Sequence, residues 1–370
     1  MSRQAVKDDS GNFPFELPLG EVSTIYVDNS LNVYVGTKRH GFKQSLSKKP
    51  SFNRNQFLTS FFKDKTIVYM SYDRHGDLWV LSDKKDIYRC RHGNEINLIY
   101  SQGKSDISRI WVDAEDCLWV GTSNTLYRGK VEGNHFVVGQ EWEMRALAIT
   151  DDKQGNTLVC SYSGEFFMKR FMSDKLELLH ASPSDMKVTK LLNLKGRGMA
   201  LVEATRGVYF ADENGGWMNA DMETLLGSNV NRVIYNDICE DNNGNLWVAT
   251  YGLGLLKIDI TTREVRSYDS EEYTHDVGSV IEDDSGHIWM GTQKGLTCLD
   301  PATERFMTFY QGEDIVDDEY ALRSCAKNPQ DGSLTFGSMS GMTSFLPKDL
   351  WFSQDSDLQM EYLFLGGTPV

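Results

Sequence analysis

Residues 241–259 read DNNGNLWVATYGLGLLKID, and the chain repeats this unit. Residues 283–300 read DDSGHIWMGTQKGLTCLD, and residues 113–129 read DAEDCLWVGTSNTLYRG. The shared pattern is an Asp, two polar residues and usually a Gly, followed by an apolar and aromatic triplet, a small residue and a second apolar run. An Asp side chain accepts backbone N–H groups across a tight turn and Gly supplies positive φ, so D-x-x-G predicts a turn between two strands. The triplet predicts a strand that is covered on both faces.

The position of the small residue recurs along the whole chain, at spacings of 45, 40, 39, 43, 46, 42 and 46 residues. The residue directly before it is Val, Met or Phe in every copy. The eight positions are Gly36, Leu81, Gly121, Cys160, Glu203, Ala249, Gly291 and Gly337. A repeat of this length with several short strands is typical of a β-propeller, in which each copy forms one blade.

One copy predicts the structure of a blade. We expect four antiparallel strands, namely strand A at 234–239, strand B around the triplet at 246–248, strand C at 255–258 and strand D at 264–268. Every blade buries both faces against its neighbours, so the ring of blades has to close.

The N-terminus suggests how the ring closes. Residues 12–17, NFPFEL, stand where a strand D is expected before the first copy, whereas the last copy ends after strand C. We therefore predict an all-β propeller of eight four-stranded blades that is closed by this N-terminal strand, with seven blades and an outlying copy as the alternative. The propeller is expected to span residues 1–350, and residues 351–370 to form an extended tail that leads toward a further C-terminal domain.

Composition excludes several classes of function. The chain has 38 Lys and Arg against 53 Asp and Glu, a net charge of -15, which argues against nucleic acid as a partner. No window of about 18 apolar residues predicts a membrane span, and the opening MSRQAVKDDSGNF lacks the apolar core of a signal peptide. The six cysteines fall in different copies without a C-x-x-C motif, so we interpret them as buried free thiols.

The motif D-x-x-G-x-L-W-V-G-T followed by G-L resembles the two-component regulator propeller repeat, which is found in the periplasmic sensor regions of hybrid two-component systems of Bacteroidetes. Residues 331–350, DGSLTFGSMSGMTSFLPKDL, are similar to the last blade of those sensors, which leads into a small immunoglobulin-like domain. The resemblance covers roughly residues 20–350. In that family two propellers, usually seven-bladed, precede a transmembrane helix, a histidine kinase and a response regulator.

The resemblance implies a periplasmic, ligand-sensing domain that binds an oligosaccharide from glycan breakdown and signals to regulate polysaccharide-utilisation genes. The expected partners are that oligosaccharide and an adjacent propeller or immunoglobulin-like domain of the parent chain. We also consider a homodimer, although no residue pattern indicates one. A full-length parent would resemble a histidine kinase, but the chain itself is not expected to be an enzyme.

Basic and aromatic residues gather on the rim opposite the D-x-x-G turns, where the D–A and B–C loops emerge. In an acidic chain, such a rim predicts an anionic ligand such as a uronate or a sulfated sugar. The candidate ligand-binding residues are Arg39, His40, Arg109, Trp111, Arg145, Tyr162, Arg206, Tyr251, His275 and Arg323. Ordinary solvated loops are the alternative for this rim, and core packing is the alternative for Trp111.

Catalytic motifs are not found. The seven His residues are scattered without an H-E-x-x-H pair, and there is no G-x-S-x-G elbow. The carboxylates of D-x-x-G recur in nearly every copy, so turn construction explains them. We predict no catalytic residue, no metal ligand and no cofactor. A polysaccharide lyase or glycoside hydrolase is the enzymatic alternative, and a protein-interaction scaffold is the third hypothesis.

Overall fold

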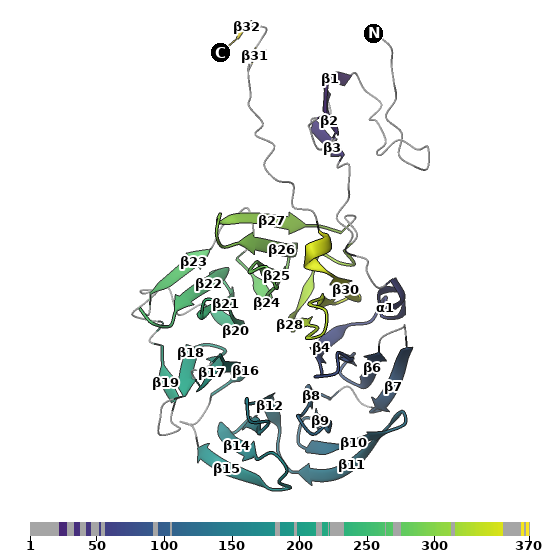
Figure 1. The fold of residues 1–370 in the computed structure, drawn as a ribbon, viewed down its shortest axis with the longest axis vertical. Helices are drawn as coiled ribbons and strands as arrows, with labels where there is room; N and C mark the ends of the chain where they lie inside the picture. Colours follow the sequence, from purple (N-terminus) through teal and green to yellow (C-terminus); the bar gives the residue numbers. More distant parts are fainter. Residues whose placement is uncertain are drawn as a thin grey trace. The chain divides into compact units, whose positions relative to one another are not determined.

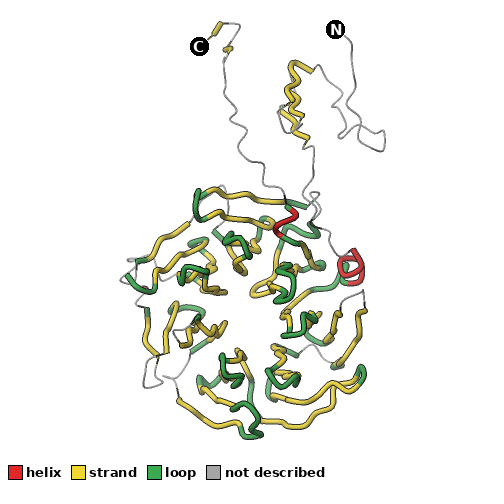
Figure 2. Tube along the Cα trace, in the orientation of Figure 1, coloured by secondary structure: helices red, strands yellow, loops and turns green. Residues whose placement is uncertain are grey.

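Antiparallel strands joined by short turns make up most of the computed structural model of the chain (Figures 1 and 2). Two compact units are present, residues 52–347 and residues 1–51 with 348–370, and each is described by itself. The structure describes residues 22–27, 33–37, 42–45, 52, 56–91, 95–103, 106–181, 186–195, 198–211, 217–220, 222, 233–262, 264–268, 275–311, 315–350, 364–365 and 368–369.

The unit of residues 52–347 is a ring of seven sheets, which we number as blades 1 to 7 (Figure 1). Blade 1 contains β4 (Ile67–Tyr72), β5 (Leu78–Ser82), β6 (Asp86–Arg91) and β7 (Glu95–Ser101), and blade 2 contains β8 (Arg109–Val112), β9 (Leu118–Gly121), β10 (Leu126–Glu132) and β11 (His135–Trp142). Blade 3 contains β12 (Ala146–Asp151), β13 (Thr157–Ser161), β14 (Glu165–Lys169) and β15 (Leu176–Ala181), and blade 4 contains β16 (Val188–Leu194), β17 (Gly198–Glu203), β18 (Gly207–Ala211) and β19 (Trp217–Asn219). Blade 5 contains β20 (Ile234–Glu240), β21 (Asn245–Tyr251), β22 (Leu255–Asp259) and β23 (Val265–Tyr268), and blade 6 contains β24 (Val277–Glu282), β25 (Ile288–Thr292), β26 (Gly295–Asp300) and β27 (Arg305–Phe309). Blade 7 contains β28 (Tyr320–Lys327), β29 (Leu334–Ser338) and β30 (Met342–Phe345).

Within each blade the strands pair in chain order and antiparallel, and the first strand lies nearest the centre of the ring (Figure 1). The four strands predicted from one copy are confirmed by β20 to β23, whose bounds differ from the prediction by at most one residue except that β21 ends three residues later. The all-β fold and the four-stranded antiparallel blades are thus confirmed.

The favoured number of eight blades is wrong, and the alternative of seven is confirmed. The first copy does fold as predicted locally, as a sheet of β1 (Val22–Val27), β2 (Val33–Thr37) and β3 (Phe42–Ser45). That sheet, however, belongs to the unit of residues 1–51 and 348–370, which also contains the hairpin of β31 (Phe364–Leu365) and β32 (Thr368–Pro369). A repeat pattern predicts how a sheet is built, but it does not encode which sheets share a face.

The first and last blades of the ring are in contact. Strand β4 packs against β28, and one apolar cluster contains Met70 of β4, Ala326 of β28 and Met342 of β30. The side-chain amide of Gln330 donates a hydrogen bond of 3.0 Å to the backbone carbonyl of Arg74, which links the turns of blades 7 and 1. The closing strand predicted at residues 12–17 lies outside the described residues and stays a prediction, as does the domain boundary at residue 350.

The side chain of Phe52 packs against the last two blades. Its side chain is 1% exposed, and its ring contacts those of Trp289, Phe309 and Phe345 at centroid distances of 6.4, 4.6 and 5.0 Å. Helix α1 (Gln56–Phe61) follows and leads into β4, so one stretch of chain joins blade 7 to blade 1. The short 3-10 helix η2 (Pro347–Asp349) follows β30.

The D-x-x-G turns are held by their Asp side chains in a way that involves the Trp of strand B. In blade 5, Oδ1 of Asp241 accepts the backbone N–H groups of Asn243 and Asn245, and Oδ2 accepts the indole N–H of Trp247 at 2.9 Å. The same indole bond, also 2.9 Å, is formed in three further blades. The Asp therefore fixes the turn and the buried Trp at the same time.

Candidate functional site

An extra residue interrupts the inner strand of most blades. In β12 the pairing with β13 shifts between Ala146 and Ala148, so Leu147 is unpaired, and single shifts of the same kind occur in β4, β16, β20 and β24. Bulges of this kind turn side chains and carbonyls away from the ladder. Here the bulges lie near the beginning of each of these inner strands, just after the D–A loop.

Strand β28 carries a larger irregularity. Tyr320 pairs with Ser338 and Cys325 with Phe336, so four residues stand between these pairs on β28 and one on β29. Arg323 lies in this segment with φ of 56°, in the left-handed region that a residue with a Cβ rarely adopts. Blade 7 thus presents an arginine from a backbone conformation that costs energy, which is common at functional sites.

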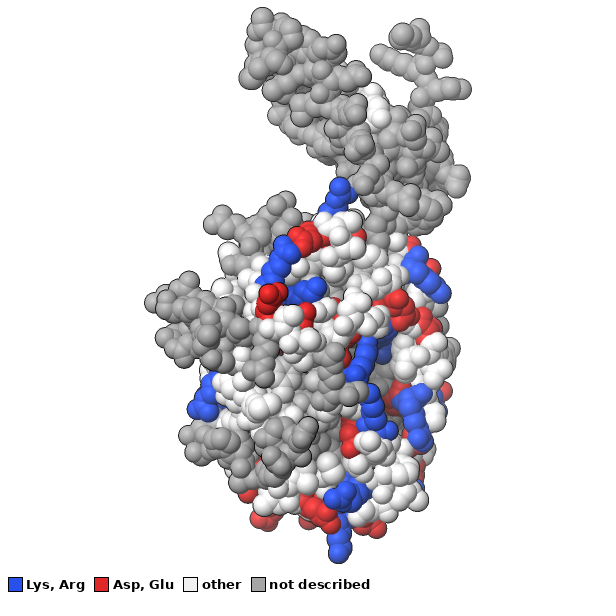
Figure 3. Space-filling view, turned by 60° about the vertical axis from the view of Figure 1, so that its left-hand side comes forward, with Lys and Arg blue, Asp and Glu red and all other residues white. Residues whose placement is uncertain are grey.

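A pocket of about 580 Å³, which we call the mouth, lies beside these bulges. It is formed by the starts of the inner strands of blades 1 to 4 and by the B–C turns of blades 1 to 3, together with Arg323 of blade 7. Its lining includes five basic residues, Lys84, Arg109, Arg145, Lys187 and Arg323, and one acidic residue, Asp106. Figure 3 shows several Lys and Arg side chains close together on the surface of the propeller.

Two of the three arginines of the mouth contact carbonyl or aromatic groups. Arg109 donates hydrogen bonds to the backbone carbonyls of Leu147, at 2.6 Å, and Ser108, at 2.7 Å. The guanidinium of Arg145 lies 4.7 Å from the ring centroid of Tyr162, which is 55% exposed. Among the residues that the structure describes, none of the three arginines forms an ion pair with a carboxylate.

Burial and mutual repulsion act on these cations. The pKa of Arg109 falls to about 10, chiefly because the guanidinium is removed from solvent and then because Arg323 and Arg145 are nearby. Burial also lowers the pKa of Arg323, although Asp237 and tyrosine hydroxyls oppose the shift. A pKa of about 10 leaves Arg109 protonated at neutral pH, so the mouth carries positive charge that no ion pair with a described carboxylate neutralises.

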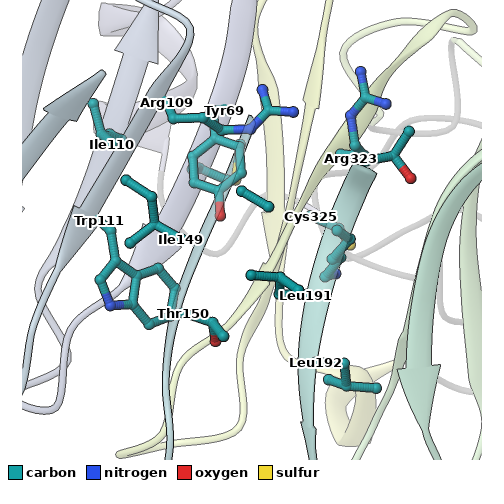
Figure 4. A pocket seen from close by; sticks show the side chains of 14 residues that line it. Tyr69, Arg109, Ile110, Trp111, Ile149, Thr150, Leu191, Leu192, Arg323 and Cys325 are labelled. Carbon is teal, nitrogen blue, oxygen red and sulfur yellow. The ribbon is translucent and has the colours of Figure 1, made fainter. Parts of the chain in front are cut away.

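A smaller pocket of about 170 Å³, which we call the chamber, adjoins the mouth (Figure 4). It is lined by residues of the inner strands β4, β8, β12, β16 and β28, among them Tyr69, Trp111 and Cys325. Arg109, Thr189 and Arg323 line both pockets, so these residues mark the junction between them.

An ion pair forms part of the chamber wall. Lys190 of β16 lies 2.5 Å from the carboxylate of Asp237 of β20, and the Lys side chain is 31% exposed while the Asp side chain is fully buried. Burial alone would lower the pKa of Lys190, but the attraction of Asp237 outweighs it and raises that pKa. Asp237 also accepts the backbone N–H of Val280 at 3.1 Å. Unlike the arginines, Lys190 therefore has a carboxylate partner within the protein.

The structure brings half of the predicted site residues together. Five of them, Arg109, Trp111, Arg145, Tyr162 and Arg323, line the mouth or the chamber. Three others line neither pocket and lie in the turns and strand ends of blades 4 to 6, namely Arg206, Tyr251 and His275. Arg39 and His40 lie outside the described residues. Ligand binding by any of them stays a prediction.

Sequence reasoning missed Tyr69 and Asp237. Tyr69 lines the chamber beneath Arg109, whose guanidinium lies 5.7 Å from its ring centroid. Asp237 lies in the middle of the inner strand IYNDICE with a fully buried side chain, and an acidic residue in the middle of a predicted buried strand is a signal that was available in the sequence.

No metal centre is found in the part of the chain that the structure describes, because no three His, Cys, Asp or Glu side chains there are placed to hold an ion. The helices within that part are also too short or too polar to span a membrane. All six cysteines are described, and none forms a disulfide.

Comparison with protein families recognises blade 5, the blade whose sequence defined the repeat. Residues 227–252 match the two-component regulator propeller repeat. The resemblance inferred from the D-x-x-G motif is thus confirmed for a regulator propeller repeat that covers β20 and β21. A comparison with curated proteins finds no match.

Solved structures share the propeller fold. One, described as the extracellular domain of the hybrid two-component system BT3049 from B. thetaiotaomicron, has a TM-score of 0.64 and 21% identity over 88% of this chain and 45% of that one. A second, described as the extracellular domain of the one-component system BT4673 from the same organism, has a TM-score of 0.63 and 16% identity over 99% of this chain and 52% of that one. This chain therefore spans about half the length of these two structures.

An enzyme also has this fold. A virginiamycin B lyase from Staphylococcus aureus has a TM-score of 0.61 and 10% identity, over 76% of this chain and 94% of the lyase. At such identities the likeness concerns the fold alone, so the choice between sensor and enzyme depends on the site.

Proposed function

We propose that this propeller is the ligand-sensing region of a two-component system sensor and that it binds an anionic oligosaccharide at the mouth. The observation that carries the proposal is the group of Arg109, Arg145 and Arg323 around a pocket of about 580 Å³ without carboxylate partners. Ligand sites typically have volumes of about 300–1,000 Å³, so several sugar units fit. A carboxylate or sulfate group supplies the charge that the protein does not supply there, and guanidinium groups bind such anions in a bidentate manner.

The sensor role is supported by the regulator propeller repeat in blade 5 and by the shared fold with extracellular domains of two-component systems. The proposal places the domain in the periplasm, next to a second propeller or an immunoglobulin-like domain of the parent protein. Binding there regulates polysaccharide-utilisation genes through the parent's signalling modules. The exposed aromatic ring of Tyr162 provides a surface on which a sugar ring stacks.

Thermal-shift measurements against a panel of neutral, uronate-containing and sulfated oligosaccharides test the proposal. A ligand at about 100 times its Kd stabilises the folded state by about 2.7 kcal/mol, so a specific ligand produces a clear rise in Tm. We expect such a rise with anionic members of the panel only. Replacing Arg109, Arg145 and Arg323 together by Glu is expected to abolish binding in calorimetry. Arg170→Glu, at an exposed arginine outside both pockets, is expected to leave it unchanged.

Binding that survives the triple replacement would show that the mouth is not the site. New reducing ends released from the panel would instead support a lyase or glycoside hydrolase. A protein that binds a partner but responds to no sugar would support the interaction scaffold.

A further inference from the structure

The two guanidinium groups at the junction lie at the same end of the chamber. In Figure 4, Arg109 and Arg323 occupy the upper end, whereas Trp111 and Leu192 lie toward the lower end. Because Arg109 and Arg323 also line the mouth, their guanidinium groups stand where the chamber opens into it. Any ligand that passes from the mouth into the chamber passes between them.

The positive charge is concentrated at this junction. Arg109 and Arg323 repel each other, which contributes to the lowered pKa of Arg109, and neither forms an ion pair with a carboxylate among the described residues. The nearest cation deeper in the wall, Lys190, is neutralised by Asp237. An anionic group is therefore bound best at the junction and not at the lower end of the chamber.

The chamber limits what lies beyond the junction. Its volume of about 170 Å³ equals that of about six water molecules, at roughly 30 Å³ for each in the liquid. This is the size of one sugar ring, and the aromatic side chains of Tyr69 and Trp111 in the lining suit the apolar face of such a ring. The mouth, at about 580 Å³, holds several further units.

We propose that the mouth and the chamber together recognise the end of an anionic oligosaccharide. The terminal sugar enters the chamber with its carboxylate or sulfate group between Arg109 and Arg323, and the rest of the oligosaccharide extends through the mouth past Arg145 and Tyr162. An acidic unit inside the oligosaccharide does not reach the junction, because the chamber has no room for the units beyond it. This inference rests on the proposed function and adds to it the direction in which the ligand binds.

The test compares two trisaccharides of the same composition, which contain one uronate either at a terminal or at the central position. In calorimetry with the unmodified protein, we expect the terminal isomer to bind at least tenfold more tightly. Glucuronate and glucose 6-sulfate, as single sugars, are expected to bind while glucose does not, and the stronger of the two identifies whether a carboxylate or a sulfate group is preferred.

Variants then locate the effect. Arg109→Gln and Arg323→Gln are each expected to reduce the preference for the terminal isomer to less than threefold. Arg145→Gln is expected to weaken both isomers by a similar factor and to keep the preference. Arg170→Gln is the control for an exposed arginine outside both pockets and is expected to change neither affinity.

The outcomes separate the two proposals. If both isomers bind equally and their binding depends on the arginines, recognition of the chain end is wrong while the proposed function stands. If neither the trisaccharides nor the acidic single sugars bind, and the panel of oligosaccharides gives no rise in Tm, both proposals are wrong. Because the comparison of isomers uses the unmodified protein, a variant that fails to fold does not prevent the test.

Discussion

The carboxylate of Asp241 has two different tasks at the residue scale. One oxygen accepts backbone N–H groups of the turn, and the other accepts Asn245 Nδ2 at 2.8 Å and Trp247 Nε1 at 2.9 Å. In Asp241→Asn an amide NH₂ group replaces an acceptor oxygen and faces donors. We expect a loss of about 2–3 kcal/mol in the free energy of unfolding, measured by denaturant titration.

Blade 3 provides the matched control for this loss. Asp152 forms the same turn, but position 158 is Leu, so Asp152 accepts no indole N–H and its second oxygen accepts only Asn156 Nδ2. Asp152→Asn should therefore cost less than Asp241→Asn. Equal losses would mean that the indole bond contributes nothing, and the recurring Trp would then act through its apolar surface alone.

Asp151 gives the propeller a pH-dependent stability. Burial raises its pKa to about 7, although a hydrogen bond from Thr157, at 2.8 Å, opposes the shift. Since this folded-state pKa lies above the unfolded value of about 3.9, the group favours folding fully below about pH 4, and its contribution is lost as the pH rises through 7. Asp151→Asn keeps an oxygen for Thr157 and never ionises.

We therefore expect Asp151→Asn to stabilise the protein by on the order of 2 kcal/mol at pH 8 and by little at pH 4. Thermal unfolding of both proteins across this range measures the difference. A stabilisation that does not change with pH would show that ionisation of Asp151 is not its cause.

At the scale of the element, the irregular segment of β28 lowers the stability of the fold and places a residue of the proposed binding site. Arg323 adopts φ of 56°, which Gly adopts without a steric cost. Arg323→Gly is expected to raise the free energy of unfolding by up to about 1 kcal/mol and to weaken binding of the anionic ligand. Arg323→Ala removes the same charge but keeps a Cβ, so the difference in Tm between the two variants isolates the backbone contribution. If the Gly variant is the less stable of the two, the backbone of β28 is not strained at this residue.

The elements of a blade are the part of this protein that sequence predicts best. The turn Asp, the Trp and the apolar column each act within one hairpin, so a single copy contains the information for β20 to β23. The bulges are different, because the extra residue of β12, Leu147, or of β16, Thr189, is not distinguished by residue type. Arg109, Arg145 and Arg323 come together through the closure of the ring of blades, so the rim of the site could be predicted from the sequence, whereas its depth and the partner of Lys190 could not.

At the scale of the whole molecule, Phe52 joins the beginning of the ring to its last blades. Removing a buried Phe side chain costs about 3–5 kcal/mol, and here it also removes aromatic contacts with Trp289, Phe309 and Phe345. We expect Phe52→Ala to lower the free energy of unfolding by that amount. Phe57→Ala, in α1 with a side chain that is 43% exposed, is the control and should cost less than about 1 kcal/mol. Equal effects in thermal unfolding would exclude a special role for Phe52 in the ring.

The blade count is where local reasoning stops. The sheet of β1 to β3 has the repeat spacing and even the register shift of a ring blade, between Val22 and Thr24. It nevertheless belongs to the other compact unit, and within the ring β4 packs against β28. Contacts between segments more than 250 residues apart, such as Tyr72 with Thr335 at 2.9 Å, leave no periodic trace in the sequence.

The unpaired residue in the inner strands has a consequence for how such a protein evolves. Because Val68, Leu147 and Thr189 stand outside the ladder and border the mouth, a substitution there alters the mouth and leaves every strand pair in register. New ligand preferences can thus be explored one position at a time, without the loss of folding that most mutations in a tightly packed ring would cause. A combinatorial library restricted to these three positions is the corresponding route for engineering.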